Sequence, residues 1–217
     1  MAVELYDEHE QGERVRKWIR EYGYSIVLGL VLAFAGIFGF RQWQEHQVGQ
    51  QALAADYFGQ IQRELDAGQL DMAEQRFEAL RDEAGRSAYV GLAKLLLAAG
   101  HVEEGNLEPA ARLYREVLEN RRLSALWPST RLRLARVLEA QGDIPAAIAV
   151  LDGGAPSGFE GPWAELRGDL YFARGDLDQA RMAYQEALDN LIGQGGNQFL
   201  LQLKLDATGP ATDGDPS

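Results

Sequence analysis

The stretch Ala164–Leu188, AELRGDLYFARGDLDQARMAYQEAL, decides the fold. On both sides of Gly175 its apolar residues recur at three- and four-residue spacing, as in two amphipathic helices joined by a tight turn. Because the residue just beyond a helix often takes the left-handed conformation, Gly175 is expected to end the first helix. Asp176 then offers a side-chain acceptor that caps the second. The stretch therefore predicts a helical hairpin.

The same pattern occurs four times along the chain. The turn glycines are 37, 37 and 33 residues apart, and each precedes an alanine by five residues and a large apolar residue by nine. The four sets are Gly68, Ala73 and Phe77; Gly105, Ala110 and Tyr114; Gly142, Ala147 and Leu151; and Gly175, Ala180 and Tyr184. The small alanine lets two helices approach, and the larger residue on the same face fills the space beside it. Four units in register predict an all-α solenoid of about four hairpins.

The polar residues after the turn glycines differ in how well they cap. Asn106 and Asp143, like Asp176, are expected to cap second helices, whereas Gln69 is a poorer cap. With Gly168 and Tyr171 added to its turn and second-helix residues, the last unit closely resembles the tetratricopeptide repeat. That resemblance implies a curved stack of helix pairs.

An uncharged stretch precedes the repeats. Residues 22–40, YGYSIVLGLVLAFAGIFGF, would form a helix about 28 Å long, close to the thickness of a bilayer core. Tyr22, Tyr24 and Trp43 mark its two ends as an aromatic belt does. The alternative is a cleaved signal peptide, but the bulky exit FGFRQW does not fit a small-residue cleavage site. The stretch predicts one uncleaved transmembrane helix.

The basic residues around the span predict its orientation. Four precede it, namely Arg14, Arg16, Lys17 and Arg20, whereas Arg41 is followed by no Lys or Arg until Arg63. Because the more basic flank stays in the cytoplasm, the large domain is expected on the far side, the periplasm in a bacterium. The expected boundaries are a cytoplasmic segment at 1–21, the span at 22–40, a periplasmic domain at 41–206 and a disordered extension at 207–217.

Small residues recur along one face of the span. Gly29, Ala33 and Gly36 are spaced by four and three residues, which lets another helix approach closely. The alternative is that glycine is simply common in membrane helices. We treat the three residues as a candidate packing face.

Charge and composition limit the possible functions. Residues 42–217 hold 16 basic and 27 acidic residues, a net charge of −11, which repels phosphate backbones and makes nucleic acid an unsuitable partner, although plain solubility explains the charge equally well. There is no cysteine, and the three histidines, His9, His46 and His101, have no convincing metal-ligand partner. His101 is expected in a solvated hairpin loop. No nucleophile, phosphate-binding or metalloprotease motif occurs, so we expect neither catalysis nor a cofactor.

A binding surface is the better candidate for a functional site. In a solenoid of stacked hairpins the first helices line the concave side. By the repeat register the residues expected there are Arg133, Arg136, Glu139, Asp169 and Phe172. The alternative is that they are ordinary surface or packing residues.

The whole layout resembles the YfgM family, the ancillary subunits of the bacterial SecYEG translocon. The matching pieces are the LYDE segment at 5–8, FRQWQEHQ at 40–47, RLRLARV at 131–137, ELRGDLYFARGD at 165–176 and LLQLKLD at 200–206. The resemblance implies a single-pass inner-membrane protein that associates with SecYEG and with PpiD, a membrane-anchored periplasmic chaperone, and that helps exported proteins reach chaperones. The residues alone allow a second hypothesis, a membrane-anchored scaffold for another cell-envelope assembly.

Overall fold

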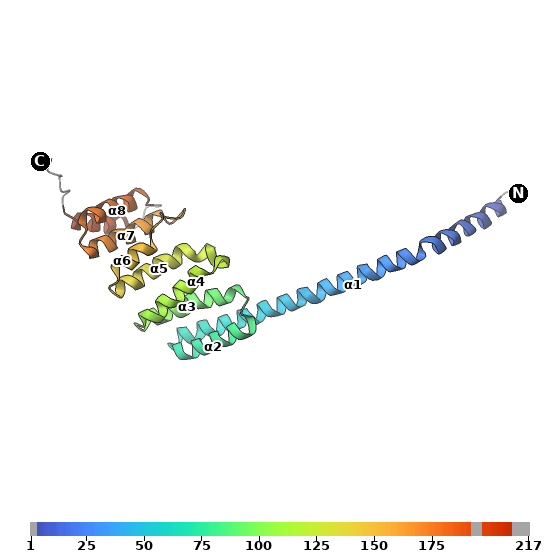
Figure 1. Ribbon diagram of the computed structural model, residues 1–217, viewed down its shortest axis with the longest axis horizontal. Helices are drawn as coiled ribbons and strands as arrows, with labels where there is room; N and C mark the ends of the chain where they lie inside the picture. Colours follow the sequence, from blue (N-terminus) through green and yellow to red (C-terminus); the bar gives the residue numbers. More distant parts are fainter. Residues whose placement is uncertain (1–3, 192–196, 210–217) are drawn as a thin grey trace. The chain divides into compact units, whose positions relative to one another are not determined.

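The computed structural model describes residues 4–191 and 197–209, and all regular secondary structure in these ranges is helical (Figure 1). The predicted all-α class is therefore confirmed. The helices are α1 (Glu4–Asp66), α2 (Leu70–Ala84), α3 (Ala88–Glu103), α4 (Leu107–Glu119), the 3₁₀ helix η1 (Arg121–Leu126), α5 (Trp127–Ala140), α6 (Ile144–Val150), α7 (Glu160–Arg174), α8 (Leu177–Asp189) and α9 (Asn197–Ala207).

The contacts divide the chain into two units, residues 1–53 and residues 54–217. The first unit is the N-terminal part of α1. Of the helices described, α1 alone is long and apolar enough to cross a membrane, with a mean hydropathy of 2.1 in its most apolar window. None of that window is buried within the protein. Since a core helix of a soluble protein would be covered, the exposed apolar surface favours a membrane span.

The second unit is a stack of four helical hairpins. The C-terminal part of α1 pairs with α2 through a shared apolar cluster and the hydrogen bond from the Tyr57 hydroxyl to Glu83 (Figure 1). In the same way α3 pairs with α4, α5 with α6, and α7 with α8. Each second helix also packs on the first helix of the next hairpin. The apolar core is accordingly split into three clusters along the stack rather than gathered at one centre. The predicted solenoid of about four hairpins is confirmed.

The four turn glycines share one conformation. Gly68, Gly105, Gly142 and Gly175 have φ between 69° and 83°, the left-handed region that favours glycine. In the last turn the Gly175 N–H donates to the Phe172 carbonyl at 2.9 Å and the Asp176 N–H to the Tyr171 carbonyl at 2.9 Å. The other three turns repeat this pair of bonds, which satisfies the open carbonyls at a helix end.

The caps follow the prediction in part. The side chains of Asp143 and Asp176 accept from Ala146 N–H and Gln179 N–H, and Gln69 makes no side-chain cap bond. The expected cap at Asn106 was wrong, because this side chain makes no cap bond. Its Nδ2 instead donates to Glu104 Oε2 at 3.2 Å, so a neighbouring carboxylate takes the amide away from the helix end.

Two tryptophans join consecutive hairpins. The Trp127 indole N–H, at the start of α5, donates to the Val117 carbonyl near the end of α4 at 3.3 Å. The Trp163 indole N–H donates to the Leu151 carbonyl just beyond α6 at 2.9 Å. Both carbonyls lie at the end of a second helix, where i+4 donors run out, and the Val117 carbonyl also accepts from the Asn120 N–H at 3.2 Å. The indoles therefore satisfy backbone groups while their rings fill the junction.

α9 is the last helix of the described stack. α9 packs on α8, with Leu201 buried in the cluster that includes Ala180 and Tyr184. The Arg181 guanidinium donates to the carbonyls of Thr208 and Gly209. Ordered structure thus extends past the expected boundary at Asp206 through residue 209, and the remainder of the expected extension, 210–217, lies outside the described residues.

A close helix crossing lies inside the last hairpin. A Cβ added at Gly168 would lie 2.5 Å from two ring carbons of Tyr184, whose hydroxyl donates to Asp169 Oδ1 at 2.9 Å. Because that hydrogen bond holds the ring, the ring cannot move away freely. Only glycine fits this crossing.

We expect Gly168→Ala to destabilise the repeat domain by about 1–3 kcal/mol through overpacking. The matched control is Gly59→Ala in α1, where the new Cβ would meet only the end of the Arg63 side chain at 3.5 Å. There alanine should stabilise the helix by about 0.5–1 kcal/mol. Urea unfolding followed by circular dichroism measures both variants, and equal midpoints would contradict the assigned crossing.

Candidate interaction surfaces

The span presents its small residues openly. Gly29, Ala33 and Gly36 are exposed, and a Cβ added at either glycine would meet no atom within 4 Å. Aromatic pairs flank the apolar stretch, Trp18 with Tyr22 at 6.1 Å between ring centroids and Phe40 with Trp43 at 6.0 Å. The aromatic pairs suit a helix anchored at both interfaces, and the packing role of the three small residues stays a prediction.

The concave candidates Arg136, Glu139 and Asp169 lie together across α5 and α7. Partial burial raises the pKa of Glu139, and the negative charge of Asp169 raises it further. Arg136 and Lys204 act in the opposite direction without cancelling the shift. The carboxylates of Glu139 and Asp169 therefore lie near enough for the charge of one to influence the pKa of the other.

Lys204 of α9 completes this cluster. Its Nζ lies 2.8 Å from Glu165 Oε1 and 2.8 Å from Asp169 Oδ1, both on α7. Burial acts to lower the pKa of Lys204, but the hydrogen bonds to Asp169 and Glu165 outweigh it and the net shift is upward. Burial, followed by the bond to Asp169, raises the pKa of Tyr184. One charged network therefore links α5, α7, α8 and α9.

The remaining two candidates lie apart from this network. Arg133 approaches Tyr114 on α4, where its charge and hydrogen bond oppose the upward pKa shift that burial gives the phenol. Phe172 on α7 is an exposed aromatic residue, 43% accessible to solvent. The repeat register alone did not indicate Glu165 or Lys204, because their role depends on how α9 folds back.

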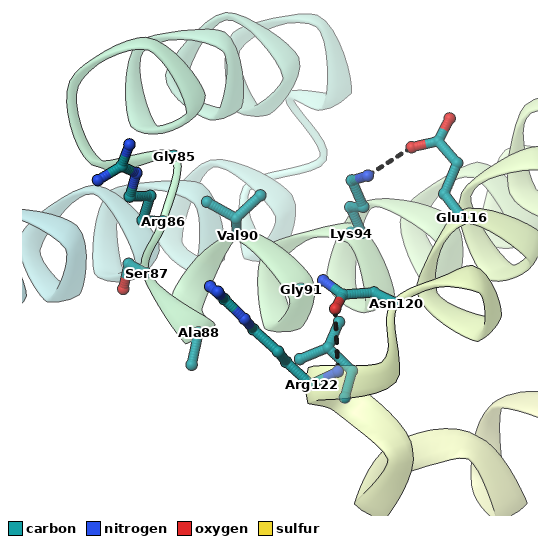
Figure 2. A pocket seen from close by; sticks show the side chains of 11 residues that line it. Gly85, Arg86, Ser87, Ala88, Val90, Gly91, Lys94, Glu116, Asn120 and Arg122 are labelled. Carbon is teal, nitrogen blue, oxygen red and sulfur yellow. Dashed lines mark hydrogen bonds and ion pairs between the residues drawn. The ribbon is translucent and has the colours of Figure 1, made fainter.

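A pocket of about 240 Å³ lies between the α2–α3 turn, the start of α3 and the end of α4 (Figure 2). Lys94 Nζ pairs with Glu116 Oε2 at 2.6 Å, and the Asn120 side chain accepts from the Arg122 N–H. Ser87 caps α3 by accepting from the Tyr89 N–H. These groups serve the local structure, and none forms a nucleophile–base pair.

His101 differs from its expected place. It belongs to the last turn of α3, is 7% exposed, and places Nε2 2.9 Å from Glu74 Oε1 on α2. The expected solvated loop was wrong because α3 continues to Glu103 and directs the imidazole toward the neighbouring hairpin. Within the described residues no group of three histidine, aspartate or glutamate side chains could hold a metal ion.

Comparison with known proteins places these surfaces in a family context. The model of the tetratricopeptide repeat-like domain matches residues 16–210. A protein of Escherichia coli (strain K12) named "Ancillary SecYEG translocon subunit" is 28% identical over 206 residues, covering 94% of this chain and 98% of that protein. A protein of the same name from Neisseria gonorrhoeae is 25% identical, covering 95% and 99%. The predicted resemblance to the YfgM family is confirmed.

Solved structures show the same fold. BtubC of P. vanneervenii superposes with a TM-score of 0.59 at 18% identity, covering 77% of this chain and 76% of that one. A kinesin light chain-like repeat protein of Podosopora anserina gives a TM-score of 0.53 at 15% identity, covering 73% and 86%. The hairpin register, the left-handed turns and the family match agree, and the chain belongs to the tetratricopeptide repeat-like domain family.

Proposed function

We propose that this chain is a non-enzymatic, membrane-anchored interaction protein that works as an ancillary subunit of the SecYEG translocon. The observation that carries the proposal is similarity over nearly the whole chain, span and repeats together, to proteins with that name. The described surfaces support a binding role, since exposed apolar side chains and partly buried charged side chains occur on the same domain. Such surfaces suit protein partners rather than small substrates.

The membrane span explains how surfaces of low affinity can be enough to bind a partner. A domain tethered to the inner membrane meets other membrane proteins at a high effective concentration, so no single contact needs to be strong. Gly29, Ala33 and Gly36 are the proposed packing face toward a membrane helix of the translocon or of PpiD. The cluster around Glu139 and Asp169 and the separate, exposed side chain of Phe172 on α7 are the proposed surface for PpiD or for exported clients.

The first prediction concerns orientation. The basic residues before the span favour a cytoplasmic N-terminus and a periplasmic repeat domain. A reporter that is active only in the periplasm, fused after residue 60, should be active, and a cytoplasmic reporter at the same position should not. The reverse pattern would overturn the proposed topology.

The second prediction concerns the span. Replacing Gly29, Ala33 and Gly36 together by leucine should preserve insertion, since leucine favours the bilayer, but should block close helix approach. Capture of SecYEG or PpiD from gently solubilised membranes should fall about tenfold. Normal capture would mean that the span only tethers the domain. Recovery of a different envelope assembly, with neither SecYEG nor PpiD, would refute the proposed function.

The third prediction concerns the concave surface. Phe172→Ser should weaken capture of PpiD about five- to tenfold, because an exposed aromatic side chain that a partner buries is a strong anchor. The matched control is Met182→Ser, which removes a 56% exposed apolar side chain from the second helix of the same hairpin. Equal binding by the two variants, at unchanged melting temperatures, would remove the concave surface from the proposal.

A further inference from the structure

The helix α9 has two apolar faces. Leu201 is 3% exposed and packs with Leu205 into the last core cluster. Phe199 and Leu203 are 73% and 49% exposed, and at about 100° per residue they point opposite to Leu201. A helix that is apolar on opposite sides is normally covered on both. The inner face of α9 is covered by the domain, whereas its outer face is open.

In the stack, α9 takes the position of the first helix of a further hairpin. The first helices α3, α5 and α7 are each covered by the second helix of their own hairpin. α9 packs on the preceding hairpin in the same way, but no second helix follows it within residues 197–209. Terminal units of soluble solenoids carry a polar outer face. The outer face of α9 is instead apolar, because Phe199, Leu200 and Leu203 are exposed there.

The segments beside α9 lack the composition of an amphipathic helix. The neighbouring segments outside the described residues are 192–196, IGQGG, and 210–217, PATDGDPS. Between them they contain one large apolar residue, Ile192. Neither sequence has the apolar spacing of an amphipathic helix. Neither segment therefore has the sequence expected of a helix that would cover the outer face of α9.

Charge indicates the character of the occupant. The region 42–217 carries a net charge of −11, so two copies brought together at α9 repel each other. Lys204 is already paired with Glu165 and Asp169, so its positive charge is neutralised. The exposed carboxylate of Asp206 therefore leaves a negative charge beside the outer face. A basic helix complements this surface where an acidic one does not.

We propose that the outer face of α9, formed by Phe199, Leu200 and Leu203, docks a basic amphipathic helix of a different protein. The docked helix takes the place of the second helix of a fifth hairpin, with apolar side chains at helical spacing against the three anchors. The face offers on the order of 300 Å² of apolar surface, too little for a stable soluble complex. Docking therefore depends on the membrane tether, and it holds whether or not the partner is a translocon component.

The test uses the full-length chain in its native membranes. A photoreactive phenylalanine derivative replaces Phe199, and the cross-linked peptide is mapped by mass spectrometry. We expect one protein adduct, located in a partner helix whose apolar stripe is flanked by lysine or arginine. Adding Leu203→Gln should reduce the adduct about tenfold without lowering the melting temperature, because Leu203 is exposed.

Matched variants separate docking from general stickiness. The same probe at Met72, a 39% exposed apolar residue of α2, should give no such adduct, and Met72→Gln should leave the Phe199 adduct unchanged. An adduct between two copies of the chain, an adduct only with lipid, a cross-link to a non-helical or acidic segment, or no adduct would each overturn the proposal. If the full-length chain gives the adduct but does not capture SecYEG, the proposed function is refuted and this inference stands.

Discussion

The repeat domain depends on a chain reversal that only glycine makes at low cost. At Gly68, Gly105, Gly142 and Gly175 a single left-handed residue ends one helix, and the next begins two residues later. A side chain with a Cβ costs about 1–2 kcal/mol in that conformation. So short a connection forces the two helices into contact along their length. The alanines and Gly168, which permit the close crossings, are a consequence of the turn.

The same geometry determines the kind of surface that the protein offers. Because each helix contacts mainly its neighbours, the core divides into three clusters and stability is a sum of local interfaces. A stack of this kind has an extended surface along which a partner protein can bind. The indoles of Trp127 and Trp163 each donate a hydrogen bond to a backbone carbonyl of the preceding hairpin. These bonds fix the orientation of each hairpin relative to the one before it.

The features that sequence predicted are those determined locally. The turn glycines and the buried alanines depend on neighbours within one hairpin. The features that it missed depend on residues far apart in the chain. Lys204 meets Glu165 and Asp169 across 39 and 35 residues, and His101 meets Glu74 across a hairpin boundary. The Asn106 cap failed because a nearby carboxylate competed for the side chain, which spacing alone does not reveal.

Two proposed contact sites lie at opposite ends of the sequence, on the span and on α9, and this separation has a thermodynamic consequence. Neither site needs the other in order to fold, because the core clusters are local. If both engage neighbours in the membrane, each raises the effective concentration at the other. Loss of one contact then weakens association without abolishing it, and the remaining contact can exchange partners. Weak, separated contacts of this kind suit a subunit that joins and leaves a larger assembly more than one that is permanently built into it.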